Sequence, residues 1–322
     1  MIAIFSQENY ETTTELVIDW LQFYKIPFKR INGVKFLANV DIEIKATKFE
    51  IKGFEDINVC WFRRWDGFSD IIGLQFTDFS SWNLYELRNH ISTEHRIVRQ
   101  TLFKYLAEKK WLTHPKEITY SKLDLLKNAV KVGLSVPDSI LTTSKSTLLK
   151  FIAEHKKVIT KIISQGIPRY SLETIDYSFG TQLITKNELK RLPDTFSASL
   201  FQKYIEKSYE IRVFFIEKKF YSMAIFSQKN SKTLIDFRNY DRELPNRRVP
   251  YQLPQTIEDK LLLLIENMNY TTGSIDLIKS KLGHYVFLEI NPGGQFGMVS
   301  LPCNYFLEEK IAHHLSNLNN EK

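Results

Sequence analysis

The 322-residue chain has few cysteines and no long apolar run, and each absence excludes a class of protein. Its two cysteines, Cys60 and Cys303, are too few and too far apart to predict a disulfide framework or a zinc site. No apolar run approaches the ~18–20 residues that are needed to cross a bilayer. The first apolar run, Met1 to Phe5, is too short for a signal-peptide core and follows no basic region. We therefore expect a soluble, cytoplasmic protein.

Several catalytic motifs are also missing. The chain contains no GxxxxGK[ST], no HExxH and no GxSxG, so readings as a P-loop enzyme, a zinc protease or a serine hydrolase have no support. Its opening segment has no GxGxxG, so that segment need not bind a dinucleotide.

The composition is that of a folded protein with a modest excess of positive charge. Hydrophobic residues make up 43% of the chain, aromatic residues 13% and charged residues 25%, and the length predicts more than one lobe. Lys and Arg number 44 against 37 Asp and Glu, which gives a formal charge of +7. Such an excess suits a polyanionic partner, whether nucleic acid, nucleotide phosphates or an acidic peptide, and charge alone does not choose among them.

The first part of the chain alternates strand and helix patterns. Apolar runs and a helical apolar face predict a strand at 1–6, a helix at 13–24 and a strand at 28–31. Another strand is expected at 59–65 and long helical material at 79–109. This order predicts a parallel α/β lobe that ends near residue 115.

A second region begins with a helix that Ser121 caps and Gly133 ends. Residues 164–180 are polar and irregular, and long loops of this kind often act as lids. Between the helix and this loop we expect an extended segment, a helix and a strand, at 140–142, 145–154 and 158–163.

The last third contains two predicted pairs of strands. The expected elements are paired strands at 210–215 and 220–226, a helix at 257–268, strands at 272–279 and 285–290, and a helical tail after Leu307.

The second pair of strands places two carboxylates together. If the strands turn symmetrically about residues 282 and 283, Asp276 lies directly opposite Glu289, with Cβ atoms ~4.5–5.5 Å apart. Asn291 follows two residues later on the same face, while Val286, Leu288 and Ile290 point to the other side. Adjacent carboxylates favour a cation, and Mg²⁺ takes such oxygen ligands. The alternative is a solvated Asp276 and a Glu289 that pairs with a lysine.

Several cationic residues are candidates for binding phosphate. Lys161 lies in a β-branched, apolar strand, where an unpaired ammonium is costly, so phosphate is its natural partner. Lys122, in the first turn of a helix, is either a surface residue or a second phosphate contact. Arg212 and Arg238 could clamp phosphoryl oxygens, although one of them could equally be an ion-pair partner. The stretch 201–206 could present backbone groups to an adenine edge.

In this order, the segments resemble an ATP-grasp enzyme, and more closely the peptide-maturing ligases of graspetide (microviridin-type) pathways. The branch that looks most similar is that of the grasp-with-spasm peptide maturases. The resemblance covers essentially the whole chain, and its last motif is the most specific. The matching segments are residues 2–6, 13–21 and 30–32, Lys122 with 129–137, 159–161, 202–205, 210–212, Asp236-x-Arg238, 273–278 and 288–296.

The resemblance implies an α/β fold with α+β lobes, in three domains. Residues 1–115 would form an N-terminal parallel α/β pre-ATP-grasp domain. Residues 116–200 would form a central ATP-grasp subdomain that carries the candidate lid loop. Residues 201–322 would form a C-terminal ATP-grasp subdomain with the metal site.

The resemblance also implies cofactors and roles for the candidate residues. ATP and two Mg²⁺ ions would be bound, with Asp276, Glu289 and Asn291 as metal ligands. Arg212, Arg238 and Lys161 would be catalytic. The implied ATP-binding residues are Lys122, Lys161, Gln202, Lys203, Tyr204, Ile205, Glu206 and Glu210.

The family joins Asp or Glu side chains of a ribosomal precursor peptide to Ser, Thr or Lys side chains, and it forms macrocyclic esters or amides. The resemblance thus implies a precursor peptide as partner, whose leader the enzyme holds outside the active site, and a homodimer. No nucleic-acid or membrane partner is expected.

The chain departs from the family's pattern at two places. Ser121 stands where relatives often carry Asn, and the loop 164–180 is not a compact glycine-rich phosphate loop. Two other functions stay open. One is an ATP-grasp ligase with another acceptor, such as one similar to the ribosomal-protein glutamate ligases. The other is a catalytically silent scaffold that binds a peptide or nucleic acid, and the presence of every candidate charged residue argues against it.

Overall fold

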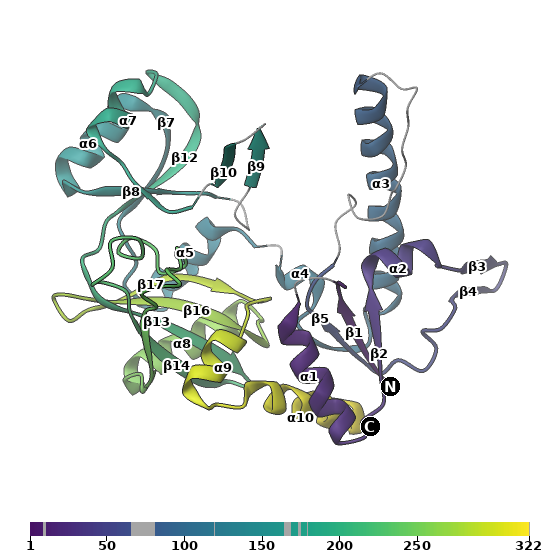
Figure 1. The fold of residues 1–322 in the computed structure, drawn as a ribbon. Coiled ribbons are helices and arrows are strands. Elements are labelled where there is room, and N and C mark those ends of the chain that lie inside the picture. The colour runs from purple at the N-terminus through teal and green to yellow at the C-terminus, as the bar shows by residue number, and fades with distance from the viewer. Residues whose placement is uncertain are drawn as a thin grey trace. The chain divides into compact units, whose positions relative to one another are not determined.

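The computed structural model describes residues 1–8, 11–65, 81–118, 120–163, 169–172, 175–178 and 180–321 of the chain. The chain divides into two compact units, and Figure 1 shows the elements of each. Unit 1 comprises Met1–Ile118, Gln295–Gly297 and Phe306–Lys322. Unit 2 comprises Thr119–Gly294 and Met298–Tyr305. The predicted boundaries at residues 115 and 200 stay a prediction.

Unit 1 is built on a parallel four-stranded sheet in the order β2-β1-β5-β6. The strand–helix–strand opening predicted from the sequence is confirmed by β1, α1 and β2. Strands β3 and β4, which lie between β2 and β5 in the sequence, pair as a separate antiparallel two-stranded sheet. The elements are β1 Ile2–Ser6, α1 Thr12–Phe23, β2 Phe28–Asn32, α2 Gly33–Ala38, β3 Ile42–Lys45, β4 Lys48–Ile51, β5 Val59–Phe62, α3 Ser81–Tyr105, β6 Lys110–Leu112 and α4 Pro115–Ile118.

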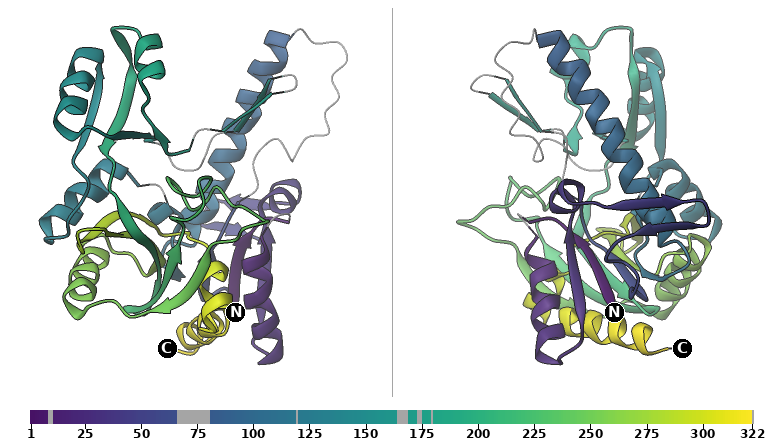
Figure 2. Two further views of the ribbon diagram at one scale, coloured as in Figure 1. Left: turned by 60° about the vertical axis from the view of Figure 1, so that its left-hand side comes forward. Right: turned by 90° about the vertical axis from the view of Figure 1, so that its right-hand side faces the viewer.

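The C-terminal helix also belongs to unit 1. Helix α10, Leu307–Asn320, packs beside α1, as both views of Figure 2 show. The Tyr24 hydroxyl donates a hydrogen bond of 2.6 Å to Glu309, and the Tyr24 ring contacts that of His313. The two ends of the sequence are therefore held in one unit by contacts that no local pattern indicates.

The described part of unit 2 contains a four-stranded and a five-stranded antiparallel sheet besides a separate strand pair, and the four-stranded sheet has the order β11-β8-β12-β7. A cluster of Leu148, Val158 and Phe201 packs helix α6 against it. The predicted strand at 158–163 ends at Lys161, where the ladder with β12 ends at the Leu200–Lys161 pair. The elements here are β7 Ser139–Ser144, α6 Lys145–His155, β8 Val158–Lys161, β11 Gln182–Leu183, α7 Lys186–Arg191 and β12 Thr195–Lys203.

The expectation that residues 164–180 are irregular is wrong for part of that segment. Strands β9, Arg169–Leu172, and β10, Ile175–Ser178, pair as an antiparallel hairpin. Antiparallel strands are paired by backbone hydrogen bonds, so two strands can pair without the strongly apolar pattern that would have predicted them from the sequence. Residues 164–168, 173–174 and 179 lie outside the described residues, so the role of this segment as a lid stays a prediction.

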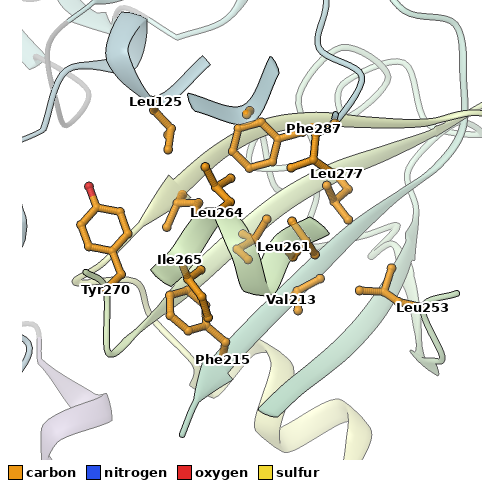
Figure 3. Close-up of a cluster of buried hydrophobic side chains, with 14 of the residues drawn as sticks. Leu125, Val213, Phe215, Leu253, Leu261, Leu264, Ile265, Tyr270, Leu277 and Phe287 are labelled. Carbon is orange, nitrogen blue, oxygen red and sulfur yellow. The ribbon is translucent and has the colours of Figure 1, made fainter. Parts of the chain in front are cut away.

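The larger sheet of unit 2 has the order β15-β14-β13-β16-β17 and packs against helices α5 and α8. Figure 3 shows Leu261, Leu264 and Ile265 of α8 among the sheet residues Phe215 and Phe287. Burying each such side chain contributes roughly 1.5–3 kcal/mol, so this core holds the sheet rigid. The remaining elements are α5 Lys122–Lys131, β13 Lys207–Ile216, β14 Lys219–Phe226, β15 Arg247–Tyr251, α8 Gln255–Asn267, β16 Thr272–Ser280, β17 Tyr285–Asn291 and α9 Gly297–Cys303.

The predicted ends of helix α5 are confirmed. The Ser121 hydroxyl accepts a hydrogen bond of 3.3 Å from the Asp124 amide, as an N-cap does. Gly133, with a φ of 78°, follows the last turn in a conformation that glycine adopts at little cost.

The predicted register of strands β16 and β17 is confirmed at the carboxylates but not beyond them. Asp276 lies opposite Glu289, and Ser274 lies opposite Asn291. A bulge then shifts the register by one residue, so that Leu277 faces Phe287. The prediction that Val286, Leu288 and Ile290 share one face is therefore wrong, because the extra residue in the bulge reverses the alternation and Phe287 packs with Ile290 in the core.

Within the described ranges, no helix is long and apolar enough to cross a membrane. Both cysteines, Cys60 and Cys303, are buried and free, and burial raises the pKa of each thiol.

Candidate functional site

Strand alternation in the larger sheet separates a charged row from the apolar core. Ile211 and Val213 of β13 point into the core, so Arg212 between them points to the opposite face. Across the ladders, Arg212 lies opposite Asp276 of β16, and Asp276 lies opposite Glu289 of β17. Three ionisable side chains from three neighbouring strands thus form one row, all of them buried.

Arg212 neutralises Asp276. Its Nη1 donates to both carboxylate oxygens of Asp276, at 2.8 and 2.7 Å. Burial and the neighbouring Glu289 nevertheless raise the pKa of Asp276, and Arg212 only partly opposes them. The Nε of Arg212 is buried and has no hydrogen-bond partner among the described residues. This donor is therefore an unused group at the site.

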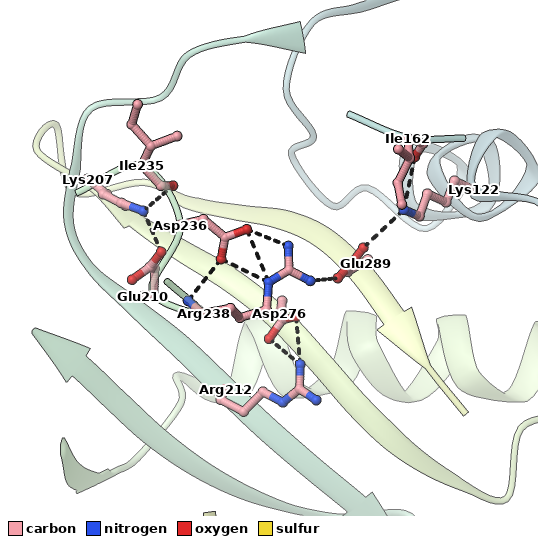
Figure 4. Close-up of polar contacts among 10 residues, drawn as sticks. All are labelled: Lys122, Ile162, Lys207, Glu210, Arg212, Ile235, Asp236, Arg238, Asp276 and Glu289. Carbon is pink, nitrogen blue, oxygen red and sulfur yellow. Dashed lines mark hydrogen bonds and ion pairs between the residues drawn. The ribbon is translucent and has the colours of Figure 1, made fainter. Parts of the chain in front are cut away.

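Glu289 is surrounded by cations, as Figure 4 shows. One carboxylate oxygen lies 3.5 Å from Nη1 of Arg238, and the other lies 3.9 Å from Nζ of Lys122. Burial acts to raise the pKa of Glu289, but Lys161, Arg238 and Lys122 together outweigh it and lower that pKa. Glu289 is therefore held as a carboxylate.

The two lysines reach the site from different elements. Lys122, the first residue of α5, donates a hydrogen bond of 3.0 Å to the carbonyl oxygen of Ile162. The ammonium of Lys161, the last residue of β8, makes no hydrogen bond or ion pair with any described residue. Burial lowers the pKa of both lysines, and Glu289 opposes this shift. Lys161 thus offers a partly desolvated ammonium that interacts with Glu289 over a distance but is not hydrogen-bonded to a described residue.

Arg238 is brought in by the loop 227–246 between β14 and β15. Its Nε and Nη2 donate to the carboxylate of Asp236, at 2.8 and 2.6 Å. Sequence reasoning missed the role of Asp236 as the partner of Arg238. The signal was the spacing Asp-x-Arg, which lets an aspartate also accept from the backbone amide two residues later, here at 3.0 Å.

Asn291 lies near this row but has a different partner. Its Oδ1 accepts a hydrogen bond of 2.9 Å from the hydroxyl of Tyr120, a residue that sequence reasoning also missed. Gly294 closes the turn after Asn291 with a 2.9 Å bond from its amide to the Asn291 carbonyl oxygen. A Cβ at Gly294 would lie 2.8 Å from that oxygen and 2.5 Å from Ser274 Oγ, so the close approach requires glycine.

Asp276 and Glu289 of the charged row line a cleft of about 640 Å³ within unit 2, a volume that includes the open space at its mouth. This size is in the range of small-molecule sites. The polar part is lined by Lys161, Asp236, Arg238, Asp276 and Glu289. The apolar part is lined by Pro137, Ile159, Tyr204, Ile205, Ile235, Phe237, Leu277, Ile278 and Leu288.

The segment predicted to contact adenine lies along the apolar part. Backbone amides of Lys203 and Tyr204 donate to Asp138 and Lys157. In contrast, the Tyr204 carbonyl and the Ile205 amide have no hydrogen-bond partner among the described residues. A donor and an acceptor on adjacent residues therefore stay available at the edge of the cleft.

Two predicted nucleotide contacts have other partners here. The amide of Gln202 donates to Ser139 Oγ at 2.9 Å, although Gln202 lines the cleft. Glu206 does not line the cleft and is paired with Lys157 and Lys281, at 3.4 and 3.5 Å.

Glu210 lines the cleft with both carboxylate oxygens engaged. One oxygen is paired with Lys207, and the other accepts a 2.5 Å bond from Ser227. Burial raises the pKa of Glu210, and Lys207 opposes the shift. Its role as a nucleotide ligand stays a prediction.

The donor set fits a hard cation that completes its shell with other oxygens. Among the described residues, no group of three or more His, Cys, Asp or Glu side chains could hold a metal ion by itself. Asp276 and Glu289 supply two facing carboxylates, with Asn291 two residue pairs along the strands. Mg²⁺ commonly binds one or two carboxylates and takes its remaining ligands from phosphate and water.

The architecture is the ATP-grasp ligase fold, as comparison with solved structures shows. The RiPP-associated ATP-grasp ligase of Chryseobacterium gregarium, in complex with ADP and a leader and core peptide, is 24% identical. Its TM-score is 0.81 over 98% of this chain and 95% of that chain. The macrocyclase MdnC of Microcystis aeruginosa MRC, bound with the precursor peptide MdnA, is 23% identical, with a TM-score of 0.79 over 98% and 99% of the two chains.

A third structure, the ATP-grasp ligase PsnB with a minimal precursor, Mg and ADP, is 14% identical, with a TM-score of 0.77 over 99% and 97% of the two chains. No protein-family model matches the chain, and no curated protein matches it. The fold predicted from the sequence, an ATP-grasp fold with an N-terminal parallel α/β lobe, is confirmed.

Proposed function

We propose that the protein is an ATP-dependent ligase that activates Asp or Glu side chains of a ribosomally made precursor peptide. It would join them to Ser, Thr or Lys side chains as macrocyclic esters or amides. One observation carries the proposal: a single cleft is lined by apolar side chains and two available backbone groups, and also by Lys161, Arg238 and the facing carboxylates of Asp276 and Glu289. Such a cleft suits a planar base at one end and magnesium-bound phosphates at the other.

The residues divide into two groups along the nucleotide. The Ile205 amide and the Tyr204 carbonyl would hydrogen-bond the base between apolar side chains such as Ile159 and Leu288. Lys161 would pair with phosphate, since an ammonium that is partly desolvated gains most from a charged partner. Lys122 donates a hydrogen bond to the Ile162 carbonyl and lies near Glu289, and it would be a second lysine that contacts phosphate.

Asp276, Glu289 and Asn291 would hold two Mg²⁺ ions, which when bound withdraw charge from the phosphoryl oxygens. Arg212, with its free Nε, and Arg238 would stabilise charge on the transferring phosphoryl group and on the acyl phosphate. No side chain of the enzyme is needed as a nucleophile. The peptide carboxylate would attack the γ-phosphoryl group of ATP and release ADP, and a peptide hydroxyl or amine would then displace phosphate from the acyl phosphate. The chain's own contribution is therefore positioning and electrostatics.

The peptide part of the proposal is supported by the three similar structures, each of which holds a precursor peptide or its parts. A different acceptor would use the same ATP site, so the acceptor must be measured. A cytoplasmic location is part of the proposal and is consistent with two free, buried cysteines. The implied homodimer stays a prediction.

The decisive experiment measures ADP release with Mg²⁺-ATP and the precursor peptide encoded beside this protein, together with the mass of the peptide. We expect ADP release and a loss of one water, ~18 Da, per ring. Glu289→Ala should abolish both, because it removes a metal ligand and leaves Lys122, Lys161 and Arg238 without their carboxylate.

Glu266→Ala is the matched control, since Glu266 is exposed on α8 and its side chain pairs, among the described residues, only with Lys218 at 2.6 Å. It should retain full activity. ADP release without a change in peptide mass would keep the ATP chemistry but replace the acceptor. No ADP release and no nucleotide binding would overturn the proposal in favour of a silent scaffold.

A further inference from the structure

The loop 227–246 that carries Arg238 is ordered by its own polar side chains. Thr233 is buried, and its hydroxyl oxygen lies 2.9 Å from the Ser227 carbonyl oxygen and 3.0 Å from Asn246 Oδ1, both within hydrogen-bond distance. Both ends of the loop are thus tied to one buried residue in its first half. A loop with such contacts can hold a side chain in a defined place although it contains no helix or strand.

A buried cation anchors the middle of this loop to the sheet. Lys207 of β13, only 2% exposed, donates a 2.9 Å hydrogen bond to the carbonyl oxygen of Ile235. Its charge is balanced by Glu210, which in turn accepts from Ser227. The peptide that Lys207 holds is directly followed by Asp236, so Lys207 fixes the position from which Asp236 acts.

Asp236 then fixes the guanidinium of Arg238. Its two oxygens accept from the amide, Nε and Nη2 of Arg238, at 3.0, 2.8 and 2.6 Å. This pairing leaves Nη1 to approach Glu289, at 3.5 Å. Figure 4 shows the guanidinium between the two carboxylates. Burial acts to lower the pKa of Arg238, but Asp236 and Glu289 outweigh it and raise that pKa.

Arg238 would not hold this place unaided. Its side chain is 36% exposed, and the nearby cations Lys122 and Lys161 repel it. An arginine side chain also loses rotamer freedom when it is fixed. A carboxylate at position 236 offsets both effects.

We infer that Asp236 is a positioning residue, which holds the guanidinium of Arg238 against Glu289 on a loop that Lys207 anchors to β13. Asp236 acts through Arg238 and does not itself contact substrate. The inference rests on the proposed function, because that function assigns Arg238 to the transferring phosphoryl group.

The test is a double-mutant cycle on ADP release. Asp236→Asn keeps the shape of the side chain but removes its charge, and we expect kcat to fall about 10- to 100-fold, as for other residues that orient a functional group. KM for ATP should change little. Asp236→Glu, which restores the charge, should recover part of the loss.

Because Asp236 acts through Arg238, the double variant with Arg238→Ala should lose no more activity than Arg238→Ala alone. Losses that multiply in the double variant would overturn the inference, since they would mean that Asp236 has a role independent of Arg238.

Asp241→Asn is the control within the same loop. Asp241 accepts from Asn230 at 3.0 Å and pairs with Lys232 at 3.3 Å, and neither contact involves Arg238. This variant should keep near wild-type activity. If it loses as much as Asp236→Asn, the effect belongs to the integrity of the loop and the inference fails.

A measurement without turnover separates this inference from the proposed function. The Nε–H of Arg238 donates to both Asp236 oxygens, so its proton should exchange slowly with water, which nitrogen-15 NMR of the Arg238 side chain can measure. Protection should be lost in Asp236→Asn and kept in Asp241→Asn. A wild-type protein without ADP release but with this pattern would refute the ligase and retain the positioning. Equal protection in all three proteins would refute the positioning.

Discussion

Glu11 illustrates how single buried charges hold unit 1 together. Its side chain is fully buried, where one oxygen accepts from Arg63 at 3.3 Å and the other accepts from Arg64 at 2.6 Å. The hydroxyls of Thr13 and Thr14 also donate to Glu11, at 2.5 and 3.0 Å. Burial acts to raise the pKa of Glu11, but Arg63, Thr13 and Arg64 outweigh it and lower that pKa.

Glu11→Gln should destabilise unit 1 by about 3–5 kcal/mol, because it leaves buried Arg63 without its carboxylate. The loss can be measured by urea unfolding followed by tryptophan fluorescence, since all five tryptophans lie in residues 1–118. Glu15→Gln on the same helix is the control: Glu15 is half-exposed in its pair with Arg30, so at most about 1 kcal/mol should be lost. Equal losses in the two variants would contradict this account.

The same carboxylate sets part of the pH dependence of unit 1. Because its folded pKa is lowered, the stabilisation is present above the ordinary value of 4.5 and is lost as the pH falls through the lowered pKa. Glu11→Gln should therefore flatten the acid side of the stability profile below about pH 4.5. An acid limb as steep as that of the wild type would refute this assignment.

At the scale of elements, local patterns predicted most helices and strands but not the loops that complete the site. The alternation in β13 and β16 was readable because one face of each strand is apolar and packs into the core, while charged residues lie on the other. The pairing of β9 with β10 and the bulge at Leu288 were not readable. A bulge depends on how the strand packs against its neighbours, and a polar hairpin has no apolar pattern to read.

Lys156 marks a strained connection between α6 and β8, the strand that carries Lys161. It has a φ of 64° and a ψ of −50°, and the amide of Lys157 donates across it to the His155 carbonyl at 2.7 Å. This is a γ-turn with positive φ, which is costly for a residue with a Cβ.

Lys156→Gly should stabilise unit 2 by about 0.5–1 kcal/mol, since relief of the strain exceeds the extra entropy that glycine loses on folding. Calorimetry is the suitable measurement, because unit 2 contains no tryptophan. Lys156→Ala removes the same exposed side chain but keeps the Cβ, and it should give no gain. A gain with alanine would show that the side chain, rather than the backbone, is responsible.

At the scale of the whole molecule, the charged row, the cleft and the available backbone groups all belong to unit 2. Unit 1 contributes the parallel sheet and all five tryptophans. Each unit can therefore be followed by its own signal, and the effect of nucleotide on one can be compared with the effect on the other.

Mg²⁺-ATP at a concentration 100 times Kd should raise the free energy of unfolding of unit 2 by about 2.7 kcal/mol, which calorimetry would detect as a higher transition temperature. The physical reason is that nucleotide binds the folded cleft and not the unfolded chain. Glu289→Ala should abolish most of the shift. A wild-type transition that does not move, or an equal shift in the variant, would argue against this site; a matching shift in tryptophan fluorescence would mean that the two units unfold together.

Features that depend on neighbours along the chain could be predicted from the amino-acid sequence. The cap at Ser121, the stop at Gly133 and the pairing of Asp276 with Glu289 each follow from spacing over a few residues, because turn geometry and strand period are local. The motif order also sufficed to predict the ATP-grasp fold.

Contacts between charged residues that are distant in the sequence could be seen only in the folded structure. The fold brings Lys122 and Arg238 to Glu289, Arg212 to Asp276, and helix α10 to α1. These partners lie far apart in sequence, and their meeting depends on the sum of burial over a whole sheet and its helices. No single segment carries that information.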